Sequence, residues 1–290
     1  MPELPEVETV RRQLAPHIEG RTITAARIDD DRWCAPQSSA AFEAALTGQQ
    51  ILRLRRRGKY LIASLSGGAQ LLMHLRMTGI LLWDVTEDAP HERVRLFLDD
   101  QYPLAFCDPR RFGTGLLLDS AADADAYLEA RLGPEPLKPE FTVGVLRDAL
   151  RGRQAPVKGI LLDQRTVAGV GNIYADEALF RAGIHPARPG RMVGSAQLAP
   201  LRDGIVEALQ LGIDGGGASI DDFRHLDGAR GSFQHDFLVH RRAGLPCPDC
   251  GTAITKMVVA GRGTYACELC QPPPRRLPRS ARREATRPTR

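Results

Sequence analysis

Two close pairs of cysteines near the C-terminus constrain the fold of this chain more than any other feature. They are spaced as Cys247-x2-Cys250-x16-Cys267-x2-Cys270. This spacing is typical of two knuckles that together give four thiolates to one tetrahedral Zn²⁺, and four thiolates leave no open coordination position. The sequence therefore predicts a zinc finger over residues 245–271 whose single zinc ion is structural. A β-hairpin over 255–263 is expected to carry Arg262 near its tip.

The chain ahead of the zinc finger changes its pattern at a proline-rich break. Residues 21–118 contain short apolar segments punctuated by Gly and Asp, which is typical of a β-sandwich or barrel. The segment GPEPLKPE at 133–140 indicates a domain boundary, and apolar residues recur at helical spacing after it. We expect strands at 22–28, 50–54, 60–65, 70–76, 94–98 and 115–118, helices at 143–151, 157–162, 172–182 and 196–213, and a short strand near 237–240.

Positive charge is concentrated at the C-terminal end. The formal net charge is +4, while residues 272–290 hold seven arginines and one glutamate. This tail has almost no apolar side chains, so we expect it to be disordered. No uncharged apolar run reaches the roughly 18 residues of a membrane span, and the acidic first residues do not form a signal peptide. We therefore expect a cytoplasmic protein with no membrane segment.

The N-terminus holds a candidate nucleophile. Removal of the initiator methionine ahead of the small Pro2 exposes a secondary amine, and an α-amine of pKa about 8 is partly unprotonated at neutral pH. Attack of such an amine on an aldehydic sugar carbon gives an iminium ion, an electron sink that permits elimination of phosphates. Glu3 and Glu6 share a face at the start of an amphipathic helix, which we expect to end at Pro16 or Gly20. These acids also suit an ordinary helix start, because they complement its dipole.

Few other groups in this chain are suited to amine chemistry. Of 39 basic residues only four are lysines, namely Lys59, Lys138, Lys158 and Lys256. Arginine stays protonated and does not readily form a Schiff base, so a nucleophilic amine is either the α-amine or one of these lysines. A general compositional bias towards arginine explains the low lysine count equally well.

Ordered motifs along the chain resemble the formamidopyrimidine-DNA glycosylase (Fpg) family. Besides MPELPEVETVRR at the N-terminus and the zinc finger, they are RRRGKYL at 55–61, HLRMTG at 74–79, DPRRFG at 108–113, LGPEPL at 132–137, LLDQRTVAGVGNIYADEALF at 161–180 and AGIHP at 182–186. The resemblance implies an α+β fold. Its expected parts are a catalytic β-sandwich domain with flanking helices over 1–133, a helix–two-turn–helix DNA-binding domain with a lesion-capping loop over 134–244, the zinc finger over 245–271, and the disordered basic tail over 272–290.

The resemblance also assigns catalytic roles. Pro2 corresponds to the Schiff-base nucleophile, Glu3 to the proton donor at the sugar, and Glu6 to an active-site carboxylate held near them. Lys59 corresponds to a lysine that contacts phosphate and transfers a proton during elimination, although its local sequence also fits a solvated basic strand end. Arg262 corresponds to a zinc-finger arginine that grips the DNA backbone and acts in the second elimination.

A further set of residues corresponds to DNA contacts or is a candidate for one: His74, His91, Arg110, Arg153, Lys158 and Asn172. Asn172 precedes a helix, and a helix N-terminus attracts phosphate. His91 is the position where the local sequence, APHERVRL, departs from the more histidine-rich pattern of the family.

Three residues correspond to those that fill the gap left by an everted nucleotide: Met77, Arg110 and Phe112. An apolar wedge and an aromatic ring recover part of the unstacking cost, and a guanidinium can hydrogen-bond the orphaned partner base. Without the resemblance, Met77 and Phe112 would be interpreted as core residues.

The resemblance implies a bifunctional base-excision-repair enzyme. It would bind duplex DNA containing an oxidised base as a monomer, excise oxidised purines such as 8-oxoguanine and formamidopyrimidines, and cleave the strand by β,δ-elimination, in a bacterial cytoplasm at the nucleoid. Two alternatives stay open: an endonuclease-VIII-like glycosylase for oxidised pyrimidines, and a non-catalytic zinc-dependent protein that binds damaged DNA. The segment 215–237 bears on lesion preference, because Ser219-Ile220-Asp221 stands where the family commonly has a more basic or neutral segment.

Overall fold

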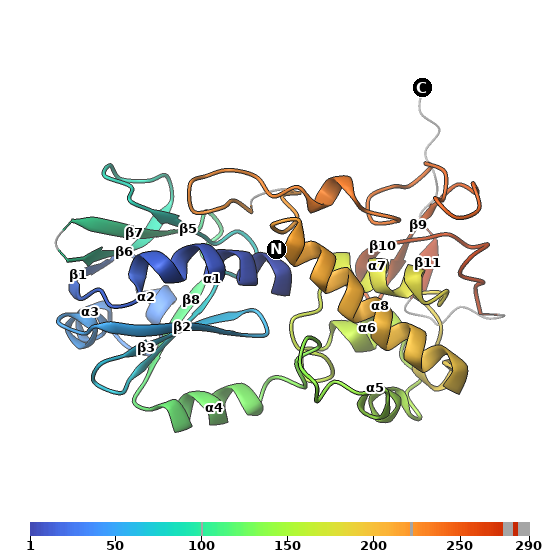
Figure 1. Ribbon diagram of the computed structural model, residues 1–290, viewed down its shortest axis with the longest axis horizontal. Helices are drawn as coiled ribbons and strands as arrows, with labels where there is room; N and C mark the ends of the chain where they lie inside the picture. Colours follow the sequence, from blue (N-terminus) through green and yellow to red (C-terminus); the bar gives the residue numbers. More distant parts are fainter. Residues whose placement is uncertain (100, 221–222, 275–280, 284–290) are drawn as a thin grey trace. The chain divides into compact units, whose positions relative to one another are not determined.

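The chain divides into two compact units (Figure 1). The computed structural model describes residues 1–99, 101–220 and 223–274, and the backbone of 281–283. The N-terminal unit comprises Met1–Arg131 and Gly212–Gln234, and the helical unit comprises Leu132–Leu211 and His235–Arg290. The first break lies next to the proline-rich segment at 133–140.

Two four-stranded antiparallel sheets form the framework of the N-terminal unit (Figure 1). One has the strand order β1-β6-β7-β5 and the other β2-β3-β4-β8. The strands are β1 (Ile23–Ile28), β2 (Ile51–Arg57), β3 (Tyr60–Leu65), β4 (Gln70–His74), β5 (Ile80–Trp83), β6 (Glu92–Leu98), β7 (Tyr102–Cys107) and β8 (Thr114–Leu118). One apolar core includes residues of both sheets, among them Leu61, Leu71 and Leu96. The predicted β-sandwich is therefore confirmed.

The N-terminal helix α1 (Leu4–Ile18) packs against β2 and β3. Its apolar residues recur every three to four positions, and Val7, Val10 and Leu14 are at most 1% exposed. The helix runs past Pro16, which was one of its two expected ends. Pro16 lies in the last turn, where its missing N–H removes one hydrogen bond and the helix closes two residues later.

Two strands and three short helices of this unit were not predicted. The strands are β5 and β7, and the helices are α2 (Asp31–Cys34), α3 (Ser39–Leu46) and α4 (Ala121–Glu129). The sequence of β5, ILLW, is a continuous apolar run without alternation. β7 contains Pro103, which argues against an internal strand, yet β7 lies between β6 and β5. Pro103 is tolerated because it is the second residue of β7, close to the point where the strand begins.

The helical unit contains the predicted helices and the zinc-finger hairpin. Its helices are α5 (Val143–Leu150), α6 (Val157–Leu162), α7 (Asn172–Arg181) and α8 (Ser195–Asp214), the last of which continues into the N-terminal unit. β9 (Thr255–Val259) and β10 (Arg262–Ala266) form the hairpin, with Arg262 directly after its turn. The predicted α+β fold class is therefore confirmed. Among the described residues, no helix is both long and apolar enough to cross a membrane.

The predicted strand near 237–240 is wrong. The backbone N–H groups of Leu238, Val239 and His240 donate instead to the Glu177 carboxylate, at 3.0–3.1 Å. A buried backbone donor needs a partner, and here a side chain takes the place of a neighbouring strand. The apolar run Phe237–Val239 therefore reflects burial without sheet pairing.

The structure differs from the sequence-based expectation in two further segments. Residues 212–234, expected within the helical domain, pack with the N-terminal unit, because Phe223 and Leu226 enter the sandwich core. The tail was expected to be disordered, but β11 (Ala281–Arg283) pairs with β9 as a third antiparallel strand. Residues 275–280 and 284–290 of the tail lie outside the described residues.

Candidate active site and nucleic-acid interface

The residues that directly follow Met1 are buried. Pro2 is buried, and Glu3 and Glu6 are only 2% and 1% exposed, whereas Met1 is 45% exposed. Chain ends are mobile unless specific contacts hold them. The segment that carries the candidate nucleophile must therefore be anchored by its neighbours.

Glu6 provides that anchor. Its Oε2 accepts the Glu3 N–H at 2.8 Å, as in a capping box, and its Oε1 accepts the Ala218 N–H at 2.8 Å. Gly217 allows this approach, since it has φ +78° and a Cβ there would lie 3.1 Å from Glu6 Cγ. The predicted active-site carboxylate therefore joins the start of α1 to the segment 212–234.

Lys59 lies at the β2–β3 turn and is 6% exposed. Arg56 joins this turn to α1, because its Nε donates to Glu8 Oε2 at 3.0 Å and its Nη1 donates to the Gly58 carbonyl at 2.9 Å. Burial alone would raise the pKa of Glu8, but Arg11 and Arg56 lower it to about 2, so the ion pair persists at neutral pH. The turn is thereby fixed to α1, the helix that begins two residues after the candidate nucleophile. Sequence reasoning missed this pair, since nothing in the sequence distinguishes it from other surface charges.

His74 is a neutral imidazole near Lys59. It pairs with Tyr60 across β3 and β4 and is 8% exposed. Burial, together with the Arg76 and Lys59 cations, lowers the pKa of His74 to about 3. Its Nδ1 accepts the Arg76 N–H at 2.9 Å. The proton is therefore on Nε2, which makes Nε2–H the group that can donate to a phosphate oxygen.

The three predicted void-filling residues, called the wedge below, are solvent-exposed. Met77 is 37% exposed and Phe112 is 49% exposed, which excludes the interpretation that they are core residues. The Arg110 guanidinium lies 4.8 Å from the centroid of the Phe112 ring. Its neighbour Arg111 turns instead to Asp30, with Nε 2.7 Å from Oδ2. The structure therefore associates Arg110, and not Arg111, with the wedge.

His91 and Arg153 are both exposed, as a DNA contact requires. His91 has a φ of 61°, and its carbonyl accepts the Asp108 N–H at 2.9 Å, which places it beside the loop that carries Phe112. Arg153 lies between α5 and α6, where its Nη1 is 3.4 Å from Thr166 Oγ1.

Lys158 lies in the interior, which corrects the prediction that it contacts phosphate. Its side chain is 0% exposed, and its Nζ lies 2.7 Å from Asp176 Oδ1. The same ammonium group donates to Thr264 Oγ1 at 2.8 Å and to the Gly263 carbonyl at 3.2 Å. Asp176 Oδ2 pairs in turn with His240 Nδ1 at 2.8 Å. Sequence reasoning could not find this arrangement, because Asp176 and His240 are far from Lys158 in the chain.

The Gly263 carbonyl connects two predicted DNA contacts within the helical unit. Asn172, the first residue of α7, donates from Nδ2 to this carbonyl at 3.0 Å. Arg262 directly precedes Gly263 and is exposed. The positions of Asn172 and Arg262 are thus fixed relative to each other, and Lys158 supports the same carbonyl from the interior.

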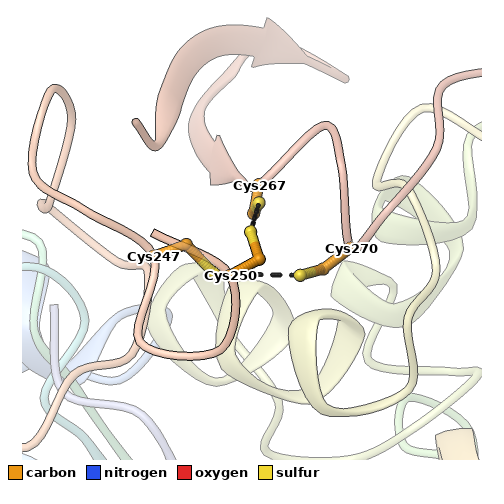
Figure 2. A group of neighbouring side chains, drawn as sticks. All are labelled: Cys247, Cys250, Cys267 and Cys270. Atoms are coloured by element: carbon orange, nitrogen blue, oxygen red, sulfur yellow. Dashed lines mark hydrogen bonds between the residues drawn. The ribbon is translucent and has the colours of Figure 1, made fainter. Parts of the chain in front are cut away.

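The four cysteines of the zinc finger converge on one point (Figure 2). Their sulfur atoms all lie within 4.8 Å of one another, with Cys250–Cys267 at 3.4 Å and Cys247–Cys270 at 3.8 Å. A tetrahedral zinc ion with Zn–S bonds of about 2.3 Å needs sulfur atoms roughly 3.8 Å apart. The cluster therefore fits one zinc ion, whose bonds would fix the knuckles on either side of the hairpin.

Three family models match most of the chain. The formamidopyrimidine-DNA glycosylase N-terminal domain matches residues 1–115, the formamidopyrimidine-DNA glycosylase H2TH domain matches 132–224, and the zinc finger found in FPG and IleRS matches 244–273. Relatives named formamidopyrimidine-DNA glycosylase from Chloroflexus aggregans and Cereibacter sphaeroides are 47% and 46% identical. Each aligns with 93% of this chain, and the alignments cover 98% and 100% of the relatives.

Solved structures agree with these matches. A point mutant of Lactococcus lactis FPG in complex with Fapy-dG DNA has a TM-score of 0.87 and 36% identity, covering 94% of this chain and 100% of that one. MutM (FPG) from Thermus thermophilus has a TM-score of 0.84 and 42% identity, covering 93% and 98%. The sandwich, the helix–two-turn–helix region and the four-cysteine finger together define a zinc-finger DNA glycosylase. The chain belongs to the formamidopyrimidine-DNA glycosylase family.

The Lys158 arrangement predicts a stability defect in Lys158→Met. This change leaves the Asp176 carboxylate buried without its cation, which costs about 3–5 kcal/mol when a buried pair is broken. Chemical denaturation should show this loss, and the double variant K158M/D176L should recover part of it. If Lys158 served mainly as a phosphate contact, K158M would keep wild-type stability and show a smaller salt dependence of DNA binding instead.

Loss of the zinc ion should weaken DNA binding. In Cys247→Ser the metal content, measured by atomic absorption, should fall from one ion per chain, and affinity for duplex DNA should fall with it, because the hairpin that carries Arg262 loses its support. Cys34→Ser is the matched control, since Cys34 is buried outside the cluster. A wild-type protein without zinc would contradict the prediction.

The contribution of His74 to DNA binding should not depend on a change in its charge. With a pKa of about 3, it stays neutral from pH 5 to 8, so the ratio of Kd between His74→Gln and wild type should be the same at pH 5.5 and 7.5. Because the unfolded imidazole has a pKa near 6.5, the stability contributed by the neutral form is fully present above that pH and declines as the pH falls towards 3. A wild-type affinity that rises below pH 6.5 and is absent in H74Q would contradict this assignment.

Proposed function

We propose that this chain is a bifunctional DNA glycosylase and abasic-site lyase that excises oxidised purines from duplex DNA. The observation that carries the proposal is the buried N-terminus anchored by Glu6, in a chain whose relatives are named formamidopyrimidine-DNA glycosylase. The solved relatives include complexes with Fapy-dG DNA and with DNA containing carbocyclic 8-oxo-G. Since the named relatives are bacterial, the enzyme acts in a bacterial cytoplasm, at the nucleoid.

The sugar chemistry starts at Pro2. Removal of the exposed Met1 turns the Pro2 nitrogen into a secondary amine, which attacks C1′ of the damaged nucleotide while the bond from C1′ to the base breaks. Glu3 donates a proton to the ring oxygen, so the sugar opens and an iminium ion forms. Loss of a 2′ proton then expels the 3′ phosphate, and a second elimination expels the 5′ phosphate.

Three further charged residues support this chemistry. Lys59, held at its turn by Arg56 and Glu8, contacts phosphate and moves a proton during elimination. Glu6 does not need to carry a proton, because its two oxygens accept backbone N–H groups; it holds Glu3 in place. Arg262 grips the backbone and assists the second elimination.

The remaining predicted contacts hold the DNA. Arg153, Asn172 and Arg262 bind phosphates from the helical unit, while His74 and His91 do so from the N-terminal unit. The zinc ion contributes by keeping the Arg262 hairpin rigid. Met77, Arg110 and Phe112 enter the space that the everted nucleotide leaves.

Oxidised pyrimidines are a second candidate substrate class. One solved neighbour is wild-type Lactococcus lactis FPG bound to DNA containing an oxidised pyrimidine, at 36% identity to this chain. A panel of duplexes containing 8-oxoguanine, a formamidopyrimidine or thymine glycol separates the two classes by single-turnover rate. We expect the two purine lesions to be excised faster, and a strong preference for the glycol would overturn the substrate assignment.

A blocked N-terminus should abolish the chemistry but not the binding. A variant with a large residue at position 2 retains Met1, so the nitrogen of residue 2 stays in a peptide bond and cannot attack the sugar, and borohydride trapping on lesion DNA should fall by more than roughly a thousandfold. Pro2→Gly, which keeps a free α-amine, is the matched control and should still trap. Unchanged trapping by the blocked variant would indicate a lysine nucleophile, with Lys59 the first to test, and no trapping by the wild type would indicate a protein that only binds damaged DNA.

A further inference from the structure

A single buried carboxylate organises both turns that carry the wedge. Asp108 is 1% exposed and accepts hydrogen bonds at both of its oxygens. Its Oδ2 accepts the N–H groups of Phe112 and Gly113 at 2.8 and 2.7 Å. Its Oδ1 accepts the Arg110 N–H at 3.1 Å and the Thr78 hydroxyl.

Asp108 is itself held by its backbone. Its N–H donates to the His91 carbonyl at 2.9 Å, and its own carbonyl accepts Arg93 Nε at 3.0 Å. The loop then closes tightly at Gly113, where an added Cβ would lie 2.5 Å from the Phe106 ring. The carboxylate therefore sits at a fixed point beneath the loop.

The four hydrogen bonds have two different consequences. The three backbone N–H donors belong to 108–113 and shape the loop that carries Arg110 and Phe112. The fourth donor, Thr78, belongs to the β4–β5 turn and directly follows Met77. The contact between Thr78 and Asp108 thus joins the two turns, and hydrogen bonds to an ionised acceptor are the strong ones in proteins.

We propose that Asp108 is a positioning residue that sets the spacing between Met77 and Phe112, so that the wedge is already formed when the protein meets DNA. Two exposed apolar side chains on independent turns would have to be ordered at the moment of insertion, at a cost in conformational entropy. A wedge built in advance avoids that cost. The inference rests on the proposed function, since only a protein that everts nucleotides needs a wedge.

Thr78→Val is the mildest test of this role, because it removes the hydroxyl and keeps the shape of the side chain. Thr78→Ser keeps the hydroxyl and should therefore show no defect. Asp108→Asn is the stronger change, since an amide NH₂ would face N–H donors in place of one oxygen. Thr9→Val is the matched control: Thr9 is also 6% exposed, but its hydroxyl donates to the Pro5 carbonyl, away from the wedge.

Wedge insertion can be observed without any chemistry. The probe is a duplex with 2-aminopurine next to a stable abasic-site analogue, because its fluorescence rises when the base is unstacked. We expect T78V and D108N to slow the fluorescence rise about ten- to a hundredfold, the equivalent of one hydrogen bond to a charged group. T78S and T9V should follow the wild type, while Phe112→Ala should reduce the amplitude.

Excision assays separate positioning from general damage to the fold. Under single-turnover conditions, the rate at which T78V excises 8-oxoguanine from a duplex should fall by about the same ten- to a hundredfold. T78V should cleave an abasic site in single-stranded DNA at the wild-type rate, since a single strand has no stacked gap to fill. Equal losses on both substrates, or a wild-type fluorescence rise in T78V and D108N, would overturn the proposal. If the wild type fails to excise any lesion, the proposed function fails, and the fluorescence comparison alone decides the role of Asp108.

Discussion

Immobilisation of the chain's own N-terminus is the constraint on which the rest of the structure depends. A terminal amine becomes a useful reagent only when it is held at one place, and termini are normally mobile. Here the Glu6 carboxylate accepts the Glu3 N–H and the Ala218 N–H, and α1 packs along the sandwich through β2 and β3. The Glu8–Arg56 ion pair then fixes the turn of Lys59 to the same helix. The β-sandwich thus supports a helix that begins at Leu4, two residues after the candidate nucleophile Pro2.

The helical unit holds its predicted DNA contacts in a similar way. The Gly263 carbonyl accepts hydrogen bonds from Asn172 and from the buried Lys158, so one backbone atom aligns a helix start with the hairpin of Arg262. Burying the Lys158–Asp176 pair gains little stability relative to apolar residues of the same size. We infer that the pair instead fixes the position of the Gly263 carbonyl. A zinc ion held by the four cysteines would likewise fix the knuckles that flank the hairpin in the sequence.

Local patterns predicted the parts whose chemistry is local. The cysteine spacing fixes a metal site by itself, and periodic apolar residues indicate α1, α5 and α8 because packing follows periodicity. The remaining features depend on residues that are distant in sequence. The burial of Lys158 depends on an aspartate that only the fold brings to it, and the segment 237–240 resembles a strand although Glu177 satisfies its N–H groups. The sequence shows Asp108 only as part of the DPRRFG motif, because the fold is needed to bring its four hydrogen-bond donors together from two turns.

The most direct test is to identify the atom that bonds to DNA. Lesion-containing duplex is incubated with the protein and borohydride, the reduced adduct is digested with trypsin, and the modified peptide is sequenced by mass spectrometry. The account predicts that the sugar remnant lies on the nitrogen of Pro2, in a peptide that lacks Met1. A remnant on Lys59 or another lysine, or an adduct with Met1 still present, would contradict it.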